Sequence, residues 1–206
     1  MNWYKICGIT NEEDLRFVTE KTAASAVGFI TYPKSPRFIQ YKKIKELLKK
    51  VPCGIRKVGV FVNPTFLEVL DYLNAGIDTI QLHGEESAEL AEDCAKFAEV
   101  WKALNPQTLQ DIEEYKNFPA NKFLIDAFST KAKGGTGKLA DWELAKYAKK
   151  ILKKDIILAG GISSQNAESA IKEVSPFGLD ISSSIEISSG IKDKSLILEL
   201  DKTLDL

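Results

Sequence analysis

Five side chains with chemically useful groups stand at or shortly after the ends of short apolar runs: Cys7, Arg37, Asn63, His83 and Asp126. Thiols, imidazoles and carboxyl groups transfer protons, and a guanidinium group binds anions. Each also has a structural interpretation, because a buried cysteine often packs as a small hydrophobe and an aspartate after a strand often caps a loop. Their shared position at the ends of the runs favours a functional site.

Glycine-rich turns follow three of the later apolar runs. They contain Gly134, Gly135 and Gly137, then Gly160 and Gly161, and finally Gly190. Glycine lets the backbone approach an anion closely, and the N–H groups at a helix N-terminus favour negative charge. We therefore expect these turns to converge on one phosphate, with simple tight turns as the alternative interpretation.

The elements that must position these groups alternate regularly along the chain. Short runs rich in β-branched residues predict strands over residues 3–7, 26–30, 57–62, 79–82, 99–103, 122–126, 156–159 and 178–182. Polar segments with apolar residues at three- and four-residue spacing predict helices over residues 12–22, 41–50, 65–75, 87–97, 109–115, 142–152, 164–173 and 192–204.

This alternation of strands and helices predicts a parallel sheet of the α/β class, covered on both faces. Eight repeats predict a single (βα)8 TIM barrel, forming one catalytic domain over residues 1–206. A doubly wound open sheet is the competing fold, but it would place its glycine-rich turn after the first strand. In a βα barrel the active site forms at the carboxyl ends of the strands, where the candidate side chains occur.

Composition narrows the classes of function. The 28 Lys and Arg residues against 29 Asp and Glu residues give a net charge of -1, which does not favour a nucleic-acid partner. No apolar run reaches the length of a membrane helix, and no signal peptide is apparent, so a cytoplasmic protein is expected. The three cysteines and the single histidine fit neither a disulfide framework nor a multi-histidine metal site, and we expect no metal.

Eight motifs occur in order across nearly the whole chain: KICGIT (5–10), SPR (35–37), VGVFVN (58–63), QLHG (81–84), LID (124–126), GGTG (134–137), LAGGI (158–162) and LDISSSIE (179–186). In this combination the sequence resembles the phosphoribosylanthranilate isomerase family of tryptophan biosynthesis. The resemblance implies an Amadori rearrangement without a cofactor. It would convert N-(5'-phosphoribosyl)anthranilate, a small phosphorylated substrate, into 1-(2-carboxyphenylamino)-1-deoxyribulose 5-phosphate.

The resemblance also implies roles for individual residues. Cys7 corresponds to the general base of the family, Asp126 to the general acid, and Arg37 to the residue that meets the anthranilate carboxylate. We interpret His83 as a polar residue of the site or a loop histidine, and Asp180 as a ligand of a sugar hydroxyl if it faces inward. Backbone N–H groups are expected to bind the phosphate at Gly135, Thr136, Gly160, Gly161, Ser182 and Ser183.

Two positions depart from the family pattern. Ser184 replaces the glycine that usually follows the two serines, and Ala140 stands where an aromatic residue usually precedes Asp141 and Trp142. A serine with a positive φ would be strained, so the simplest expectation for Ser184 is an ordinary φ that leaves the neighbouring amides usable.

The implied reaction places opposite demands on the acid and the base. Opening the ribose ring requires a proton for the ring oxygen, so Asp126 must stay protonated through desolvation or a nearby negative charge. Removal of a proton from the adjacent carbon requires Cys7 to spend time as a thiolate, which positive charge favours. Lys5 lies on the same side of its strand as Cys7, and we leave open whether it reaches the sulfur or serves as a charge of the barrel interior.

Three other functions compete with this interpretation. A histidine-pathway isomerase that performs the same rearrangement would resemble this chain but carry aspartate where Cys7 stands. Indole-glycerol-phosphate synthase would call for an extra segment before the first strand. A degenerate barrel that only binds sugar phosphates is disfavoured by the presence of both Cys7 and Asp126. The oligomeric state, monomer or homodimer, stays open.

Overall fold

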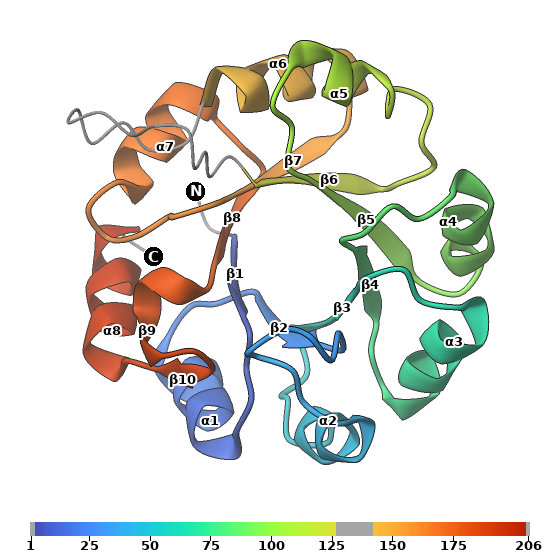
Figure 1. The fold of residues 1–206 in the computed structure, drawn as a ribbon. Coiled ribbons are helices and arrows are strands. Elements are labelled where there is room, and N and C mark those ends of the chain that lie inside the picture. The colour runs from blue at the N-terminus through green and yellow to red at the C-terminus, as the bar shows by residue number, and fades with distance from the viewer. Residues whose placement is uncertain (1–2, 127–141, 205–206) are drawn as a thin grey trace.

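The computed structural model describes residues 3–126 and 142–204, and within them eight parallel strands form a closed barrel (Figure 1). The last strand pairs with the first, and this pairing completes the ring. Each strand lies within one residue of the predicted bounds, so the (βα)8 barrel is confirmed. The strands are β1 Tyr4–Cys7, β2 Ala26–Ile30, β3 Arg56–Phe61, β4 Thr79–Leu82, β5 Glu99–Leu104, β6 Lys122–Asp126, β7 Asp155–Ala159 and β8 Gly178–Ile181.

Helices follow the strands and form the outer layer of the barrel (Figure 1). In the described part of the chain they are α1 Glu12–Lys21, α2 Tyr41–Leu48, α3 Phe66–Ala75, α4 Ala88–Ala95, α5 Leu109–Glu113, α6 Trp142–Leu152, α7 Ala167–Val174 and α8 Lys194–Thr203. None of the helices in residues 3–126 and 142–204 is both long and apolar enough to cross a membrane.

Local hydrogen bonds explain where several helices begin. Thr65 and Glu68 form a capping box at the start of α3, in which each side chain binds a backbone N–H of the other residue. The predicted start of α7 at residue 164 is wrong by three residues. The Asn166 side chain instead accepts a hydrogen bond from the Ser163 N–H and donates one to the Gly161 carbonyl, both at 2.9 Å, so this segment forms a turn next to β7.

The core has an inner and an outer part. Inside the barrel, small and aliphatic side chains from alternate strand positions pack with Trp101, which is fully buried. Between the strands and the helices lies a larger apolar layer that includes Ile6, Phe29 and Leu158. The outer layer forms because both faces of a parallel sheet are covered, which is also why the strands read as almost continuous apolar runs.

A short antiparallel hairpin between β8 and α8 was not predicted. A single 3₁₀ turn, η1 Ser183–Ile185, leads into β9 Glu186–Ser188 and β10 Ile191–Lys192. The predicted helix start at Lys192 is wrong, because α8 begins two residues later with Asp193 as its N-cap. The apolar residues of the hairpin, Ile187 and Ile191, are exposed. Hydrophobic periodicity does not predict these strands, because it assumes that the apolar residues of a strand face inward.

Candidate active site

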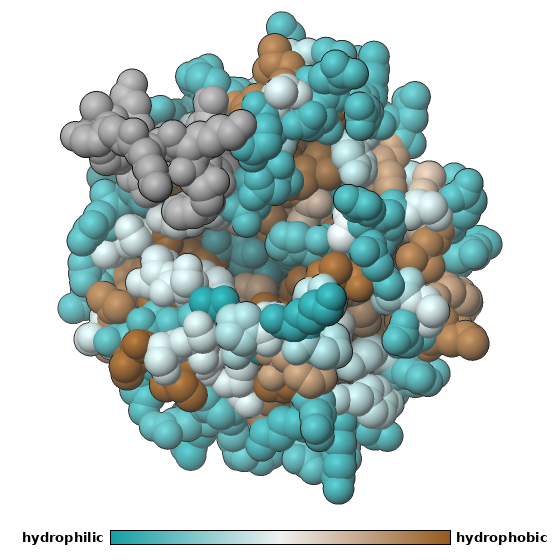
Figure 2. All heavy atoms as spheres, in the orientation of Figure 1, coloured by the Kyte–Doolittle hydropathy of each residue, from teal (hydrophilic) through white to brown (hydrophobic). Residues whose placement is uncertain are grey.

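A cavity of about 240 Å³ opens at the carboxyl ends of the barrel strands. In the orientation of Figure 1, the space-filling view shows a hollow at the centre of the ring, bordered largely by hydrophilic residues (Figure 2). The cavity brings together nine of the predicted site residues: Cys7, Arg37, His83, Asp126, Gly160, Gly161, Asp180, Ser182 and Ser183. Gly135 and Thr136, also predicted to bind phosphate, lie outside the described residues, as does Ala140.

The Cys7 thiol sits at the end of β1, opposite Gly28 of β2 in the strand register. A Cβ atom on Gly28 would stand 2.8 Å from the Cys7 Sγ and 3.1 Å from the Lys5 Nζ, so only glycine leaves room for both groups. Burial raises the pKa of the Cys7 thiol above its usual value, although the ammonium groups of Lys5 and Lys192 act in the opposite direction. Without substrate, Cys7 is therefore mainly a thiol at neutral pH.

The Lys5 ammonium group lies beside the Cys7 thiol, since a Cβ atom added to Gly28 would be close to both the Nζ and the Sγ. Its side chain is fully buried between β1 and β8, and its Nζ lies 2.8 Å from an Asp180 carboxylate oxygen. Burial lowers the pKa of this ammonium group, but the negative charges of Asp180 and of the Cys7 thiolate outweigh burial, and the pKa is raised overall. Lys5 is therefore a buried cation paired with one carboxylate and next to one thiol. Asp180 faces inward, as its predicted role requires.

Asp126 ends β6 and lines the same cavity as Cys7 of β1. His83 follows β4 and is also part of the lining. Burial lowers the pKa of the His83 imidazole, and the negative charges of Asp126 and Asp180 only partly oppose this effect. His83 is thus a neutral hydrogen-bonding group at neutral pH. Gln81, two residues earlier on β4, places its Nε2 3.4 Å from the His83 Nδ1.

The turns after β7 and β8 present backbone to the cavity. Gly160 and Gly161 have φ angles of 90° and 69°, which favour glycine. Ser182 precedes the η1 turn, and the first amides of such a turn have no partner within it. Ser184 lies inside η1 with no positive φ, as expected, and its hydroxyl donates to the Ile162 carbonyl.

Arg37 lines the cavity, but one edge of its guanidinium group is already occupied. Its Nε and Nη2 donate to the Glu186 carboxylate at 2.7 to 3.0 Å. The predicted two-pronged contact with a substrate carboxylate must therefore use the remaining edge. Glu186 is the last residue of the LDISSSIE motif, and its pairing with Arg37 could not be predicted because 149 positions separate the two residues.

Asn63 and Gly190, which the sequence offered as candidates, lie outside the cavity lining. Asn63 has a φ of 49° and its side chain accepts a hydrogen bond from the Glu85 N–H, so it caps a loop beside the cavity. Gly190 turns the β9–β10 hairpin and contacts Thr10, away from the cavity lining, so the predicted phosphate role of its turn is not supported. Cys94 is buried and Cys53 is exposed, as free thiols outside the site.

Gln81 and Ser184 are polar residues of the cavity that the sequence analysis did not assign to it. Gln81 could have been found, because it lies two residues before His83 on the same face of β4. The rest of the wall is apolar and comes from alternate strand positions and the adjoining turn: Ile30, Val60, Leu124, Ala159 and Ile162. The cavity lining is therefore mixed, and its polar and apolar groups can contact different parts of one small-molecule ligand.

A closed parallel barrel with titratable side chains gathered at the carboxyl ends of its strands defines the class of protein, a (βα)8-barrel enzyme. Residues 4–202 match the family model described as N-(5'phosphoribosyl)anthranilate (PRA) isomerase. The chain belongs to this family of isomerases of tryptophan biosynthesis.

Curated relatives agree with this assignment over the full length. The N-(5'-phosphoribosyl)anthranilate isomerase of Thermotoga neapolitana is 40% identical over 203 residues, which cover 96% of each chain. The enzyme of Clostridium acetobutylicum is 38% identical over 194 residues, covering 94% of this chain and 93% of the relative.

Solved structures show the same fold. Phosphoribosylanthranilate isomerase from Thermotoga maritima superposes with a TM-score of 0.90 at 36% identity, covering 100% of this chain and 99% of the other. A family member in complex with reduced 1-(o-carboxyphenylamino)-1-deoxyribulose 5-phosphate has a TM-score of 0.88 at 34% identity, with the same coverage.

Proposed function

We propose that the chain converts N-(5'-phosphoribosyl)anthranilate into 1-(2-carboxyphenylamino)-1-deoxyribulose 5-phosphate with Cys7 as general base and Asp126 as general acid. The observation that carries this proposal is the placement of both side chains, from β1 and β6, in one cavity at the carboxyl end of the barrel. An acid and a base on different strands can face a sugar from two sides, as the rearrangement requires.

The reaction divides into two proton transfers. The Asp126 carboxyl donates its proton to the ring oxygen, which opens the ribose and leaves a Schiff base with the anthranilate nitrogen. The Cys7 thiolate then removes the proton from C2, and the resulting enamine tautomerises to the ketose. Because burial raises the pKa of Cys7, its thiolate is a strong base once formed. The adjacent Lys5 ammonium stabilises that thiolate.

The remaining polar residues are proposed to bind the two ends of the substrate. Arg37 uses its unoccupied edge for the anthranilate carboxylate, since a planar guanidinium group matches a carboxylate. Asp180 accepts a hydrogen bond from a sugar hydroxyl, and the neutral His83 borders the same space. The backbone of the late turns binds the phosphate at Gly135, Thr136, Gly160, Gly161, Ser182 and Ser183.

A coupled assay tests the proposed function directly. Phosphoribosylanthranilate is generated in place from anthranilate and phosphoribosyl pyrophosphate by an added phosphoribosyltransferase, which releases pyrophosphate. Its disappearance is then followed with and without the purified chain. The expected result is an acceleration that scales with enzyme concentration and yields the carboxyphenylamino deoxyribulose phosphate by mass spectrometry. Disappearance at the uncatalysed rate would refute the proposal.

We further propose that the chain acts in the cytoplasm as a single catalytic domain, without a nucleic-acid or membrane partner. Its formal charge of -1 supports a small-molecule substrate and gives no electrostatic reason to bind nucleic acid. The Thermotoga maritima relative is described as dimeric. Light scattering on the purified chain distinguishes a monomer from a homodimer.

A further inference from the structure

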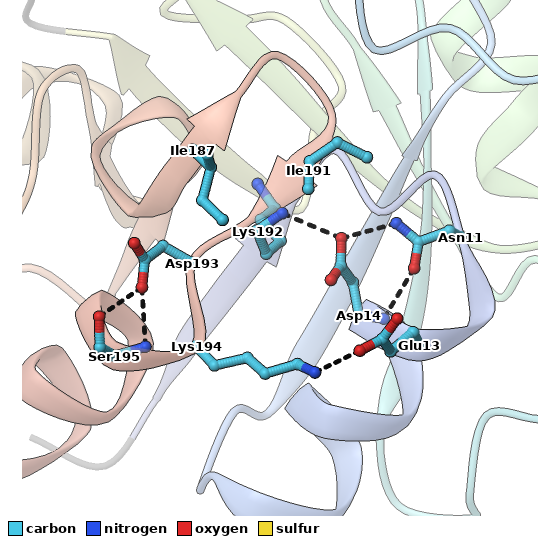
Figure 3. Close-up of a pocket in the computed structure, with 9 residues that line it drawn as sticks. All are labelled: Asn11, Glu13, Asp14, Ile187, Ile191, Lys192, Asp193, Lys194 and Ser195. Atoms are coloured by element: carbon cyan, nitrogen blue, oxygen red, sulfur yellow. Dashed lines mark hydrogen bonds and ion pairs between the residues drawn. The ribbon is translucent and has the colours of Figure 1, made fainter.

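The hairpin after β8 presents two charged side chains inward. Glu186 of β9 and Lys192 of β10 are partners in the strand register, and their side chains form an ion pair at 2.8 Å with exposed fractions of only 4% and 0%. The outward positions carry Ile187 and Ile191, which border a groove of about 610 Å³ between the hairpin, α1 and α8 (Figure 3). The hairpin thus buries its charges and exposes its apolar residues, the reverse of the usual arrangement.

The Lys192 ammonium group has one hydrogen-bond acceptor for each of its three N–H donors. Its Nζ donates to the Cys7 carbonyl at 2.6 Å, to the Glu186 carboxylate at 2.8 Å and to the Ser182 carbonyl at 3.2 Å. An ammonium group has three N–H donors and no acceptor, so three oxygen partners match its protonated form. One lysine therefore ties the hairpin to the ends of β1 and β8, where the catalytic base and a phosphate-binding turn are proposed to lie.

The Lys192 backbone is fixed as well. Its N–H donates to the buried Asp14 carboxylate at 3.0 Å, and the Asn11 side chain donates to the same oxygen at 2.7 Å (Figure 3). Lys194, just beyond the hairpin, pairs with Glu13 of α1. These contacts anchor the hairpin to the first helix from outside the cavity.

Glu186 connects the β9–β10 hairpin to Arg37. The carboxylate receives hydrogen bonds from both Arg37 and Lys192. Burial alone would raise the pKa of Glu186, but these bonds outweigh it and the pKa is lowered, so Glu186 stays ionised. Gly8 supports the arrangement from the other side, because a Cβ atom there would lie 2.7 Å from the Arg37 Cδ. Arg37 is therefore held by Glu186 at its guanidinium group and packs against Gly8 along its aliphatic part.

We propose that Glu186 and Lys192 are positioning residues that fix Arg37 and thereby set the preference of the enzyme for a carboxylated substrate, an inference that rests on the proposed role of Arg37. Glu186 holds the Nε and Nη2 edge, which leaves the terminal Nη1/Nη2 edge for the anthranilate carboxylate. Neither Glu186 nor Lys192 needs to touch the substrate.

Charge explains why the pair includes a lysine. Arg37 and Glu186 together are neutral and would attract an anionic ligand only weakly. Lys192 restores a formal charge of about +1 to the group of three, in a site where low exposure strengthens electrostatic attraction. The arrangement therefore holds Arg37 rigidly and still favours a negative ligand, which a lone Arg–Glu pair would not do.

The test compares two ligands in the intact enzyme. One is reduced 1-(o-carboxyphenylamino)-1-deoxyribulose 5-phosphate, and the other is the same compound without the carboxylate. Glu186→Gln keeps the side-chain size and an oxygen for Lys192, but weakens the hold on Arg37. We expect calorimetry to show about tenfold weaker binding of the carboxylated ligand and nearly unchanged binding of the other. In an Arg37→Met background the Glu186→Gln change should have no further effect on either ligand.

Glu86→Gln is the matched control. Glu86 forms a second fully buried ion pair, with Lys102 at 2.8 Å, and neither residue lines the cavity. Glu86→Gln should lower the free energy of unfolding by a similar amount. It should leave unchanged the ratio of the affinities for the ligands with and without the carboxylate. If Glu186→Gln weakens both ligands equally, or adds to Arg37→Met, the positioning role is wrong. If Arg37→Met itself does not discriminate between the ligands, the proposed role of Arg37 fails instead.

Discussion

The two ends of the barrel use charged residues differently. At the amino end, Glu99 of β5 pairs with Arg56 of β3 and Lys122 of β6 at 2.6 and 2.7 Å, and all three side chains are partly exposed. At the carboxyl end, Lys5 and Lys192 are fully shielded from solvent and their acidic partners nearly so. Exposed pairs contribute about 0 to 1 kcal/mol, whereas removing one partner of a buried pair costs about 3 to 5 kcal/mol.

The two ends of the barrel also differ in their aromatic packing. Trp3 contacts Trp101 and Phe177 at the amino end, with ring centroids 5.6 and 5.3 Å apart, and closes that end of the barrel. The carboxyl end is open and is lined by glycine, serine and titratable groups. One end of the barrel therefore favours stability, while the other accepts costly buried charges around the Cys7 thiol and the Asp126 carboxyl group, the two groups proposed to transfer protons.

The largest expected effect comes from removing the proposed proton-transfer groups at the carboxyl end. Cys7→Ala and Asp126→Asn should each lower kcat by about 10²-fold to 10⁴-fold without unfolding the barrel, and the double variant should lose less than the product of the two. Steady-state kinetics with circular dichroism tests both statements.

At the amino end, Glu99→Gln provides the contrast. It should lower Tm measurably but change kcat by less than about twofold, because the charge lies far from the cavity. Wild-type turnover in Cys7→Ala or Asp126→Asn would show that the assigned role is wrong. A large loss of kcat in Glu99→Gln would contradict the claim that charges at the amino end of the barrel serve stability alone.

The next effect concerns the positive φ of Gly161 in the proposed phosphate site. Gly161→Val should raise KM by about tenfold to 100-fold, because a β-branched residue disfavours this φ and blocks the approach of an anion. Gly54→Val is its control, since Gly54 has a φ of 92° with no atom within 4 Å of an added Cβ, in the loop before β3. Both variants should lose stability, but an equal rise of KM in both would contradict a phosphate site at Gly161.

A smaller and graded effect is expected for the pH dependence of Cys7. Because its pKa is raised, its alkylation by iodoacetamide should increase about tenfold per pH unit through neutral pH and level off only above the usual thiol range. Lys5→Met should shift this curve to higher pH, since the Lys5 ammonium lowers the pKa of Cys7. Peptide mass spectrometry separates Cys7 from the exposed Cys53. A curve that moves to lower pH in Lys5→Met would refute the proposed effect of Lys5.

The smallest effect is expected at Ser184. Its φ is not positive, so Ser184→Gly relieves no strain and removes the hydrogen bond to the Ile162 carbonyl. We expect a loss of about 1 kcal/mol or less in the free energy of unfolding, with kcat/KM nearly unchanged. Urea denaturation and steady-state kinetics measure both quantities. Simultaneous gains in stability and kcat/KM would show that the serine is strained after all.

Local sequence patterns were sufficient to predict the barrel and most of the residues that line the cavity. Each strand is a short apolar run, and the carboxyl ends of parallel strands meet at one end of a barrel, so Cys7, His83 and Asp126 could be placed together from their positions in the sequence. The β9–β10 hairpin could not be found in this way. Its strands are three and two residues long, and their apolar side chains face outward.

Contacts between charged residues far apart in the sequence could not be predicted either. The contact of Glu186 with Arg37 and that of Lys192 with Cys7 join residues 149 and 185 positions apart, and no local pattern encodes them. The direction of the Cys7 pKa also differs from what the sequence suggested. Neighbouring positive charge was expected to favour the thiolate, and it does, but burial has the larger effect.

The pairing of β8 with β1 has a consequence for how the protein is made. Lys192, whose ammonium group donates to the Cys7 carbonyl, follows Cys7 by 185 positions, so Cys7 is synthesised long before this partner. Contacts between such distant residues form late and slow the folding of a chain. In a nascent polypeptide the Cys7 thiol therefore lacks this part of its surroundings until translation has passed the hairpin, and we expect activity to recover during refolding only once β8 pairs with β1.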